Sequence, residues 1–154
     1  MSSTYDLYRR VSAMPFGHTL FSIAFGRKAP YFRTVRPHVA QMRPHYAEVH
    51  VPKRRAVHNH IGTIHAIAVC NGLEAAMGLL AEATTPDGMR WLPKGMQVSY
   101  LAKSTSDLVC IAETSQADWD GAPDVPVHVR ATRADGIVVV EGTISLWVTD
   151  KRSG

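Results

Sequence analysis

The sequence predicts an α+β protein in which an antiparallel sheet wraps around one long central helix. Three observations favour this fold class. A single long apolar stretch of helical character runs from about residue 64 to residue 83. Segments with the two-residue periodicity of strands lie before and after it, and Asp135-Gly136 between two β-rich runs is a strong hairpin signal. Strands segregated from one long helix are typical of α+β folds.

Length and composition predict one domain spanning residues 1–154. The chain has the usual size of a single domain, and its 45% hydrophobic and 19% charged residues argue against wholesale disorder. The formal charge of +4 suits a phosphorylated ligand or nucleic acid, but the basic residues form no long run. Cys70 and Cys110 lie in apolar surroundings, as expected of reduced thiols in a cytoplasmic protein. No apolar run approaches the length that spans a bilayer, so we expect no membrane association.

Residues 1–33 are expected to form a helical N-terminal extension that packs over the rest of the chain. Thr4–Ala13 and His18–Phe25 fit two short helices. Met14-Pro15-Phe16-Gly17 separates them, because proline and glycine interrupt helices, and Gly26 is expected to end the second.

The strands are predicted from alternating apolar residues and from the turn residues that bound them. Pro37 near the start of the first strand indicates an edge strand or a late start, and Pro44 marks the turn after it. Met89–Pro93 and Trp119–Pro126 are predicted to be loops. The predicted strands are 35–42, 46–51, 96–101, 108–114, 127–132 and 137–148.

The central helix is expected from Ile64 to about Ala83, with Thr63 as its N-cap. It is apolar nearly all round, which predicts burial, and Glu74 stands out within it. A buried carboxylate must be paired, hydrogen-bonded or protonated, and a raised pKa would suit a general base or a nucleophile. The alternative is that Glu74 reaches the surface or caps a neighbouring loop.

The spacing of His65 and Glu74 constrains any site that uses both. Nine residues of helix separate them by about 13 Å along the axis and place them on opposite sides. Both can serve one reaction only if the second comes from another copy across a two-fold interface. Otherwise only one of the two takes part.

Other kinds of site fit this histidine-rich stretch less well. A metal site from His58, His60 and His65 lacks a fourth ligand, and the sequence has no frame for a metal-dependent nuclease. No nucleophile elbow is present, and Cys70 falls inside the apolar helix. We therefore expect neither a metal nor an organic cofactor.

The segment Asn59-His60-Ile61-Gly62-Thr63-Ile64-His65, followed nine residues later by Glu74, resembles a known family motif. It is similar to the Asn-x-x-Gly-Thr-x-His-Gly-Gly…Asp segment of PaaI-like hotdog-fold acyl-CoA thioesterases. The closer resemblance is to an uncharacterised branch of that superfamily. The matching runs are Pro15–Gly17, Ala29–Phe32, Asn59–Ala66 and Pro93–Met96.

The resemblance implies a hotdog fold, a homodimer that can assemble further into a dimer of dimers, and active sites at the dimer interface. It implies that Asn59 orients the water or the thioester, and that His65 lies near the thioester carbonyl. The Ala66 N–H would be the oxyanion donor, and Glu74 of the other subunit the base or nucleophile. We place Asn71, Gly62, Arg54, Arg55, Lys94 and Lys103 among the substrate-binding residues. This chain has Ala66-Ile67 where the motif has Gly-Gly, and Glu74 where it has aspartate.

These observations predict hydrolysis of an acyl-CoA or a related acyl thioester. One alternative is a hotdog protein that binds an acyl ligand without turnover, which the missing glycine pair favours. Hydration or dehydration of an acyl thioester would need His65 and Glu74 in one site, which is open only across two chains. Nucleic-acid binding has no support beyond the net charge.

Overall fold

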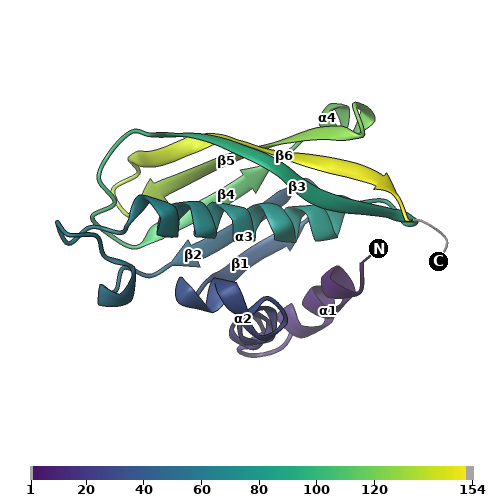
Figure 1. Ribbon diagram of the computed structural model, residues 1–154. Coiled ribbons are helices and arrows are strands. Elements are labelled where there is room, and N and C mark those ends of the chain that lie inside the picture. The colour runs from purple at the N-terminus through teal and green to yellow at the C-terminus, as the bar shows by residue number, and fades with distance from the viewer. Residues whose placement is uncertain (1, 152–154) are drawn as a thin grey trace.

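The computed structural model describes residues 2–151, and its centre is a long helix that lies against one face of a curled antiparallel sheet (Figure 1). The helix is α3 (Ala66–Thr84). The strands are β1 (His38–Arg43), β2 (Tyr46–Val51), β3 (Met89–Tyr100), β4 (Leu108–Glu113), β5 (Asp124–Arg133) and β6 (Val138–Asp150). The predicted α+β hotdog fold is therefore confirmed.

The six strands pair in the order β1-β2-β4-β5-β6-β3, so β1 and β3 are the two edges. The β1 edge begins directly after Pro37, as the missing proline N–H predicts. The β3 edge pairs with β6 along almost its whole length and leaves its other side unpaired. Asp135-Gly136 makes the predicted turn between β5 and β6, where Gly136 has a φ of +85°.

The core lies between α3 and the sheet. The helix buries Leu73, Met77, Leu79 and Leu80 completely, against inward-facing valines and alanines of β2, β4 and β5. Contrary to the sequence-based expectation, α3 is long and apolar enough to cross a membrane by those two criteria alone. Because 61% of that apolar window is buried within the protein, α3 has the burial of a core helix.

The N-terminal segment forms α1 (Ser3–Ser12), α2 (Gly17–Lys28) and the 3-10 helix η1 (Pro30–Thr34). These elements lie beside β1 and α3 (Figure 1). Tyr8 and Phe21 pack edge to face with their ring centroids 5.1 Å apart and join the main core. Gly26 does not end α2, because the helix continues to Lys28.

Several other predicted boundaries are also wrong, including the start of the first strand, which is His38 rather than residue 35. The helix α3 begins at Ala66, and its N-cap is His65 rather than Thr63. The stretch predicted as a loop at Met89–Pro93 is the first half of β3, which an edge strand allows because the missing proline N–H is not needed there. Residues 119–126 include the end of a short helix, α4 (Gln116–Asp120), and the start of β5.

Candidate active site

The loop that precedes α3 is organised by the side chain of Asn59. Its Oδ1 accepts hydrogen bonds from the N–H groups of Ile61 at 3.2 Å and Thr63 at 3.1 Å. Its Nδ2 donates to Thr63 Oγ1 at 2.8 Å. Gly62, with a φ of +78°, makes the bend that these bonds require. Because Nδ2 carries two hydrogens, one N–H of Asn59 is left for a ligand.

His65 ends this loop and caps α3. Its Nδ1 accepts a hydrogen bond from the Ile67 N–H at 3.1 Å, so a neutral ring carries its proton on Nε2. The imidazole is exposed. The next amide, Ala66 N–H, donates no hydrogen bond to any group in residues 2–151. Two adjacent residues thus offer N–H donors at the positive end of the helix dipole.

The start of α3 is held in place by the loop that joins β3 to β4. The N–H of Ile64 donates to the carbonyl of Ser104 at 3.0 Å, and the N–H of His65 donates to the carbonyl of Val57 at 2.8 Å. Ser104 is buried. The position of the His65 and Ala66 donors therefore depends on a contact from a segment about forty residues away in the sequence.

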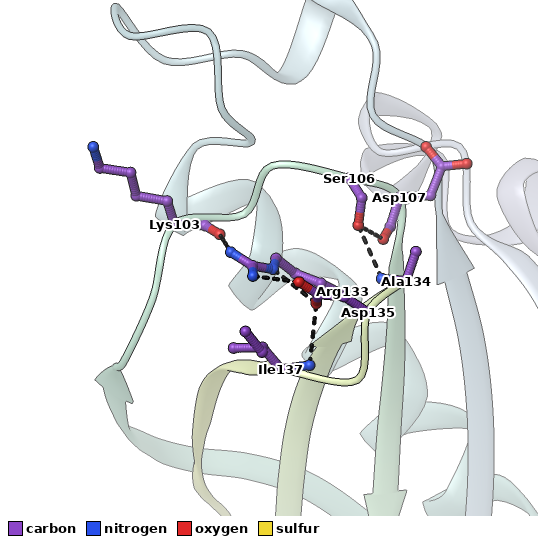
Figure 2. Close-up of polar contacts among 7 residues, drawn as sticks. All are labelled: Lys103, Ser106, Asp107, Arg133, Ala134, Asp135 and Ile137. Atoms are coloured by element: carbon purple, nitrogen blue, oxygen red, sulfur yellow. Dashed lines mark hydrogen bonds and ion pairs between the residues drawn. The ribbon is translucent and has the colours of Figure 1, made fainter.

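That loop is in turn braced by the turn between β5 and β6 (Figure 2). Arg133 Nη1 donates to the carbonyl of Lys103 at 3.1 Å, and the Ala134 N–H donates to Ser106 Oγ at 3.0 Å. Asp135 fixes the guanidinium of Arg133 at 2.5 Å. Figure 2 shows the ammonium group of Lys103 extending away from this network. The brace thus uses the backbone carbonyl of Lys103 and leaves its side chain outside the network.

Glu74 lies on a stripe of α3 that the sheet does not cover. Ile67, Asn71, Glu74 and Gly78 form this stripe, with Ile67 exposed and the other three half-buried. The composition of the helix predicts burial on every side. Within a single chain, however, this stripe of α3 stays exposed or half-buried. The Glu74 carboxylate makes no hydrogen bond or ion pair with the part of the chain that the structure describes.

Cys70, one turn before Glu74, is buried beside this stripe and contacts the hydroxyl of Tyr100 on β3. Burial raises the pKa of the Cys70 thiol, so it remains protonated at neutral pH. The second cysteine, Cys110, is fully buried, and burial raises its pKa to about 12. Neither thiol has the lowered pKa of a catalytic cysteine nucleophile.

The structure does not bring all the predicted site residues together within one chain. Asn59, Gly62, His65 and Ala66 gather at the start of α3. Glu74 follows Ala66 by eight helical residues, about 12 Å along the axis at the usual rise. Within one chain, the two groups of predicted site residues therefore lie apart along the same helix.

Of the four predicted cationic residues, Arg54 and Arg55 are adjacent in the chain, whereas Lys94 lies on β3 and Lys103 lies in the loop between β3 and β4. Lys94 is ion-paired with Asp124 at 2.6 Å, and its ammonium lies 4.7 Å from the centroid of the Trp147 ring. Arg54 is half-buried, and its guanidinium donates to the carbonyl of Thr34. Arg55 and Lys103 are exposed and unpaired with any described carboxylate. Phosphate binding by Arg54, Arg55, Lys94 and Lys103 stays a prediction.

Sequence reasoning missed a group of arginines, Arg27, Arg33 and Arg36, which line a hollow together with Arg54. Their crowding within residues 27–36 was a signal, but only the packing of α2 against η1 places them on one surface.

Within residues 2–151 no three His, Cys, Asp or Glu side chains are grouped to hold a metal ion.

Comparison with known proteins gives the family. A family described as "Domain of unknown function (DUF4442)" matches residues 17–148, which is most of the chain. The chain belongs to this family. No curated protein is significantly similar to the DUF4442 protein described here. A crystal structure described only as a genomics target is 40% identical, with a TM-score of 0.86 over 96% of this chain and 99% of that one.

More distant structures share the fold of this DUF4442 protein. A Pseudomonas aeruginosa protein of unknown function, described as a probable thioesterase, is 16% identical with a TM-score of 0.74, covering 90% of this chain and 97% of its own. A hypothetical thioesterase from Streptococcus pneumoniae, crystallised with coenzyme A, is 18% identical with a TM-score of 0.68, covering 83% and 99%. At the level of fold, the resemblance to hotdog thioesterases is confirmed.

Proposed function

We propose that this DUF4442 protein is an acyl-CoA thioesterase whose two active sites form across a homodimer. The observation that carries the proposal is that α3 has two polar groups without a hydrogen-bond partner in the described part of the chain. The Ala66 N–H at its start has no hydrogen-bond partner among the described residues, and neither has the Glu74 carboxylate in its middle. A two-fold axis beside α3 would bring the donor of one copy opposite the carboxylate of the other.

The exposed β3 edge supports such an assembly. Its outer side is unpaired over a strand of twelve residues, and it exposes Leu92, Met96 and Tyr100. A long, exposed, apolar edge strand is a template for pairing with another chain. Because β3 runs past the Cys70 and Glu74 region of α3, pairing of two β3 strands would cover the open stripe of the helix.

The proposed reaction needs no group beyond the protein and water. The Ala66 N–H and the His65 Nε2–H polarise the thioester carbonyl, and the free N–H of Asn59 orients the substrate or the water. Glu74 of the partner subunit removes a proton from a water molecule while the oxygen of that water attacks the carbonyl carbon. The carbon–sulfur bond then breaks, and the thiolate leaves and takes up a proton. The alternative, direct attack by the carboxylate, passes through an acyl-enzyme that water hydrolyses.

Replacement of the carboxylate tests the proposal. Glu74→Gln keeps the size of the side chain and removes its basicity, so we expect kcat/KM for an acyl-CoA panel to fall at least a hundredfold. The matched control is Glu82→Gln, on the same helix, whose carboxylate only accepts a hydrogen bond from Trp91 Nε1 at 3.2 Å. It should retain activity. Equal rates for wild type and Glu74→Gln would remove Glu74 from the mechanism.

A second candidate function is binding of an acyl ligand without turnover. Ile67 favours it, because its side chain is 53% exposed at the start of α3, where the thioesterase motif has glycine. A bulky side chain there narrows the approach to the Ala66 N–H. Tight acyl-CoA binding with no hydrolysis by wild type, and none by Ile67→Gly, would support this function. Gain of turnover in Ile67→Gly would show that the side chain blocks an otherwise complete site.

A further inference from the structure

A hollow of about 570 Å³ lies between α2, η1, the start of β1 and Arg54. Four arginines line it: Arg27, Arg33, Arg36 and Arg54. No aspartate or glutamate is among its lining residues. Four positive charges around one open space create a potential that attracts anions.

The arginines of the hollow differ from the ion-paired cations of the protein. Lys94, Arg130 and Arg133 each lie next to a carboxylate. By contrast, the side chains of Arg27, Arg33 and Arg36 make no ion pair or hydrogen bond to any residue that the structure describes. Like charges held close together repel, and a bound anion would remove that repulsion.

Arg54 is half-buried, whereas the other three arginines of the hollow are exposed. Its guanidinium donates to the Thr34 carbonyl, which ties the side chain to η1. Its Nε is buried and has no hydrogen-bond partner within residues 2–151. A buried N–H donor without an acceptor is unfavourable, so this atom would gain from an anionic oxygen in the hollow.

Backbone geometry also shapes this surface. Arg36 has a φ of +48°, a left-handed conformation that non-glycine residues seldom adopt and that recurs at ligand sites. In α2, a Cβ on Gly26 would lie 3.1 Å from Cγ of Arg33. The missing side chain at Gly26 therefore leaves room for Arg33 to lie along the helix beside the hollow.

The hollow lies on the same side of the molecule as the candidate active site. Figure 1 shows β1 beginning and β2 ending at the end of the protein where α3 begins. Arg54 follows β2 and leads through η2 (Arg55–Val57) into Asn59. A ligand with phosphates at one end and a reactive group on a long flexible arm could therefore use both places.

We propose that this arginine hollow binds the 3′-phosphorylated nucleotide end of coenzyme A. The planar guanidinium group forms bidentate hydrogen bonds with phosphate oxygens, and a phosphomonoester adds up to two negative charges. This inference rests on the proposed function, and it assigns three residues, Arg27, Arg33 and Arg36, to recognition of the carrier end of the substrate. The acyl end remains with α3.

Calorimetric titration of the full chain with coenzyme A, 3′-dephospho-coenzyme A, adenosine 3′,5′-bisphosphate and inorganic phosphate tests the assignment. Coenzyme A should bind wild type roughly tenfold more tightly than the dephosphorylated form, as expected for loss of a charge-assisted contact. Arg33→Gln combined with Arg36→Gln should abolish that preference. The control Arg9→Gln combined with Arg90→Gln removes two exposed arginines outside the hollow and should retain it. Equal affinity of inorganic phosphate and coenzyme A would assign the hollow to free phosphate and overturn the inference.

Kinetics separate this inference from the proposed hydrolysis. The Arg33→Gln/Arg36→Gln variant should raise KM for acyl-CoA about tenfold with kcat unchanged, as expected for loss of uniform binding. Turnover by wild type with an unchanged KM in this variant would overturn the arginine site and leave hydrolysis standing. Binding of adenosine 3′,5′-bisphosphate that depends on Arg33 and Arg36, without acyl-CoA turnover, would support the arginine site and contradict hydrolysis.

Discussion

At the scale of single residues, His38 couples the stability of the protein to pH. Burial lowers the pKa of His38, and the nearby imidazoles of His50 and His18 lower it further. The ring centroids lie 6.2 Å and 6.5 Å away, respectively. The folded protein therefore resists protonation of a group that the unfolded chain protonates near its ordinary pKa of 6.5.

The sign of the pH effect follows from this pKa shift. The unfolded chain binds the proton more readily, so the stabilising contribution is complete above pH 6.5 and is lost as the pH falls towards the folded pKa. We expect urea unfolding free energy to decrease between pH 7.5 and pH 5, and His38→Gln to flatten that decrease. The control is His60→Gln, at an exposed loop position. An unchanged pH slope in His38→Gln would contradict the prediction.

At the scale of elements, two glycines of α3 show how tightly the helix packs on the sheet. A Cβ on Gly72 would lie 2.8 Å from both Cys110 Sγ and Val51 Cγ2, below any normal contact. A Cβ on Gly78 would lie 3.5 Å from Cη2 of Trp91, which is an ordinary van der Waals distance. The same substitution on one helix should therefore have opposite effects at the two positions.

We expect Gly72→Ala to destabilise the protein by about 1–2 kcal/mol, because overpacking outweighs the helix propensity gained by alanine. Gly78→Ala should raise the unfolding free energy by about 0.5–1 kcal/mol through that propensity. Denaturant unfolding of both variants beside wild type measures the difference. Equal stability of the two variants would mean that α3 does not lie as close to β2 and β4 as the structure has it.

At the scale of the whole molecule, one chain leaves two adjoining surfaces uncovered. The outer edge of β3 exposes Leu92 and Met96, and α3 exposes the stripe that carries Glu74. A homodimer that covers both is part of the proposed function, because each active site would need residues from two chains. Assembly and activity should therefore be lost together.

Two charged substitutions on the β3 edge test this dependence. Leu92→Lys combined with Met96→Lys places like charges where two β3 strands would meet, so we expect sedimentation to show monomers. Acyl-CoA hydrolysis should fall to the level of Glu74→Gln. The control Ile137→Lys changes a 46%-exposed residue at the β5–β6 turn and should leave both properties unchanged. A fully active monomer would exclude a shared site.

Elements with local sequence patterns could be predicted from the residues alone. The alternation in Tyr46–Val51 predicted β2 with the bounds that the structure shows, and the Asp-Gly turn predicted the β5–β6 hairpin. The resemblance of the Asn59–His65 segment to a family motif implied the hotdog fold, and the apolar run from Ile64 to about Ala83 predicted a long core helix. The strand alternation, the turn and the apolar helical run each depend on residues that are close in the sequence, so they can be recognised without the structure.

The surfaces that are covered, and the distant residues that meet, depend on how the elements pack together. Pro93 can lie inside β3 because β3 is an edge strand of the sheet. β3 is an edge because it pairs only with β6, which is distant in the sequence. Thr63 does not cap α3, because its hydroxyl accepts a hydrogen bond from Asn59 that closes the loop. His65 caps the helix instead, by accepting a hydrogen bond from the Ile67 N–H. Packing of α2 and η1 beside β1 gathers the four arginines. The sheet packs on the other side of α3 and leaves Glu74 partly exposed. Burial depends on which elements pack against a residue in three dimensions. The periodicity of one element does not show which elements those are.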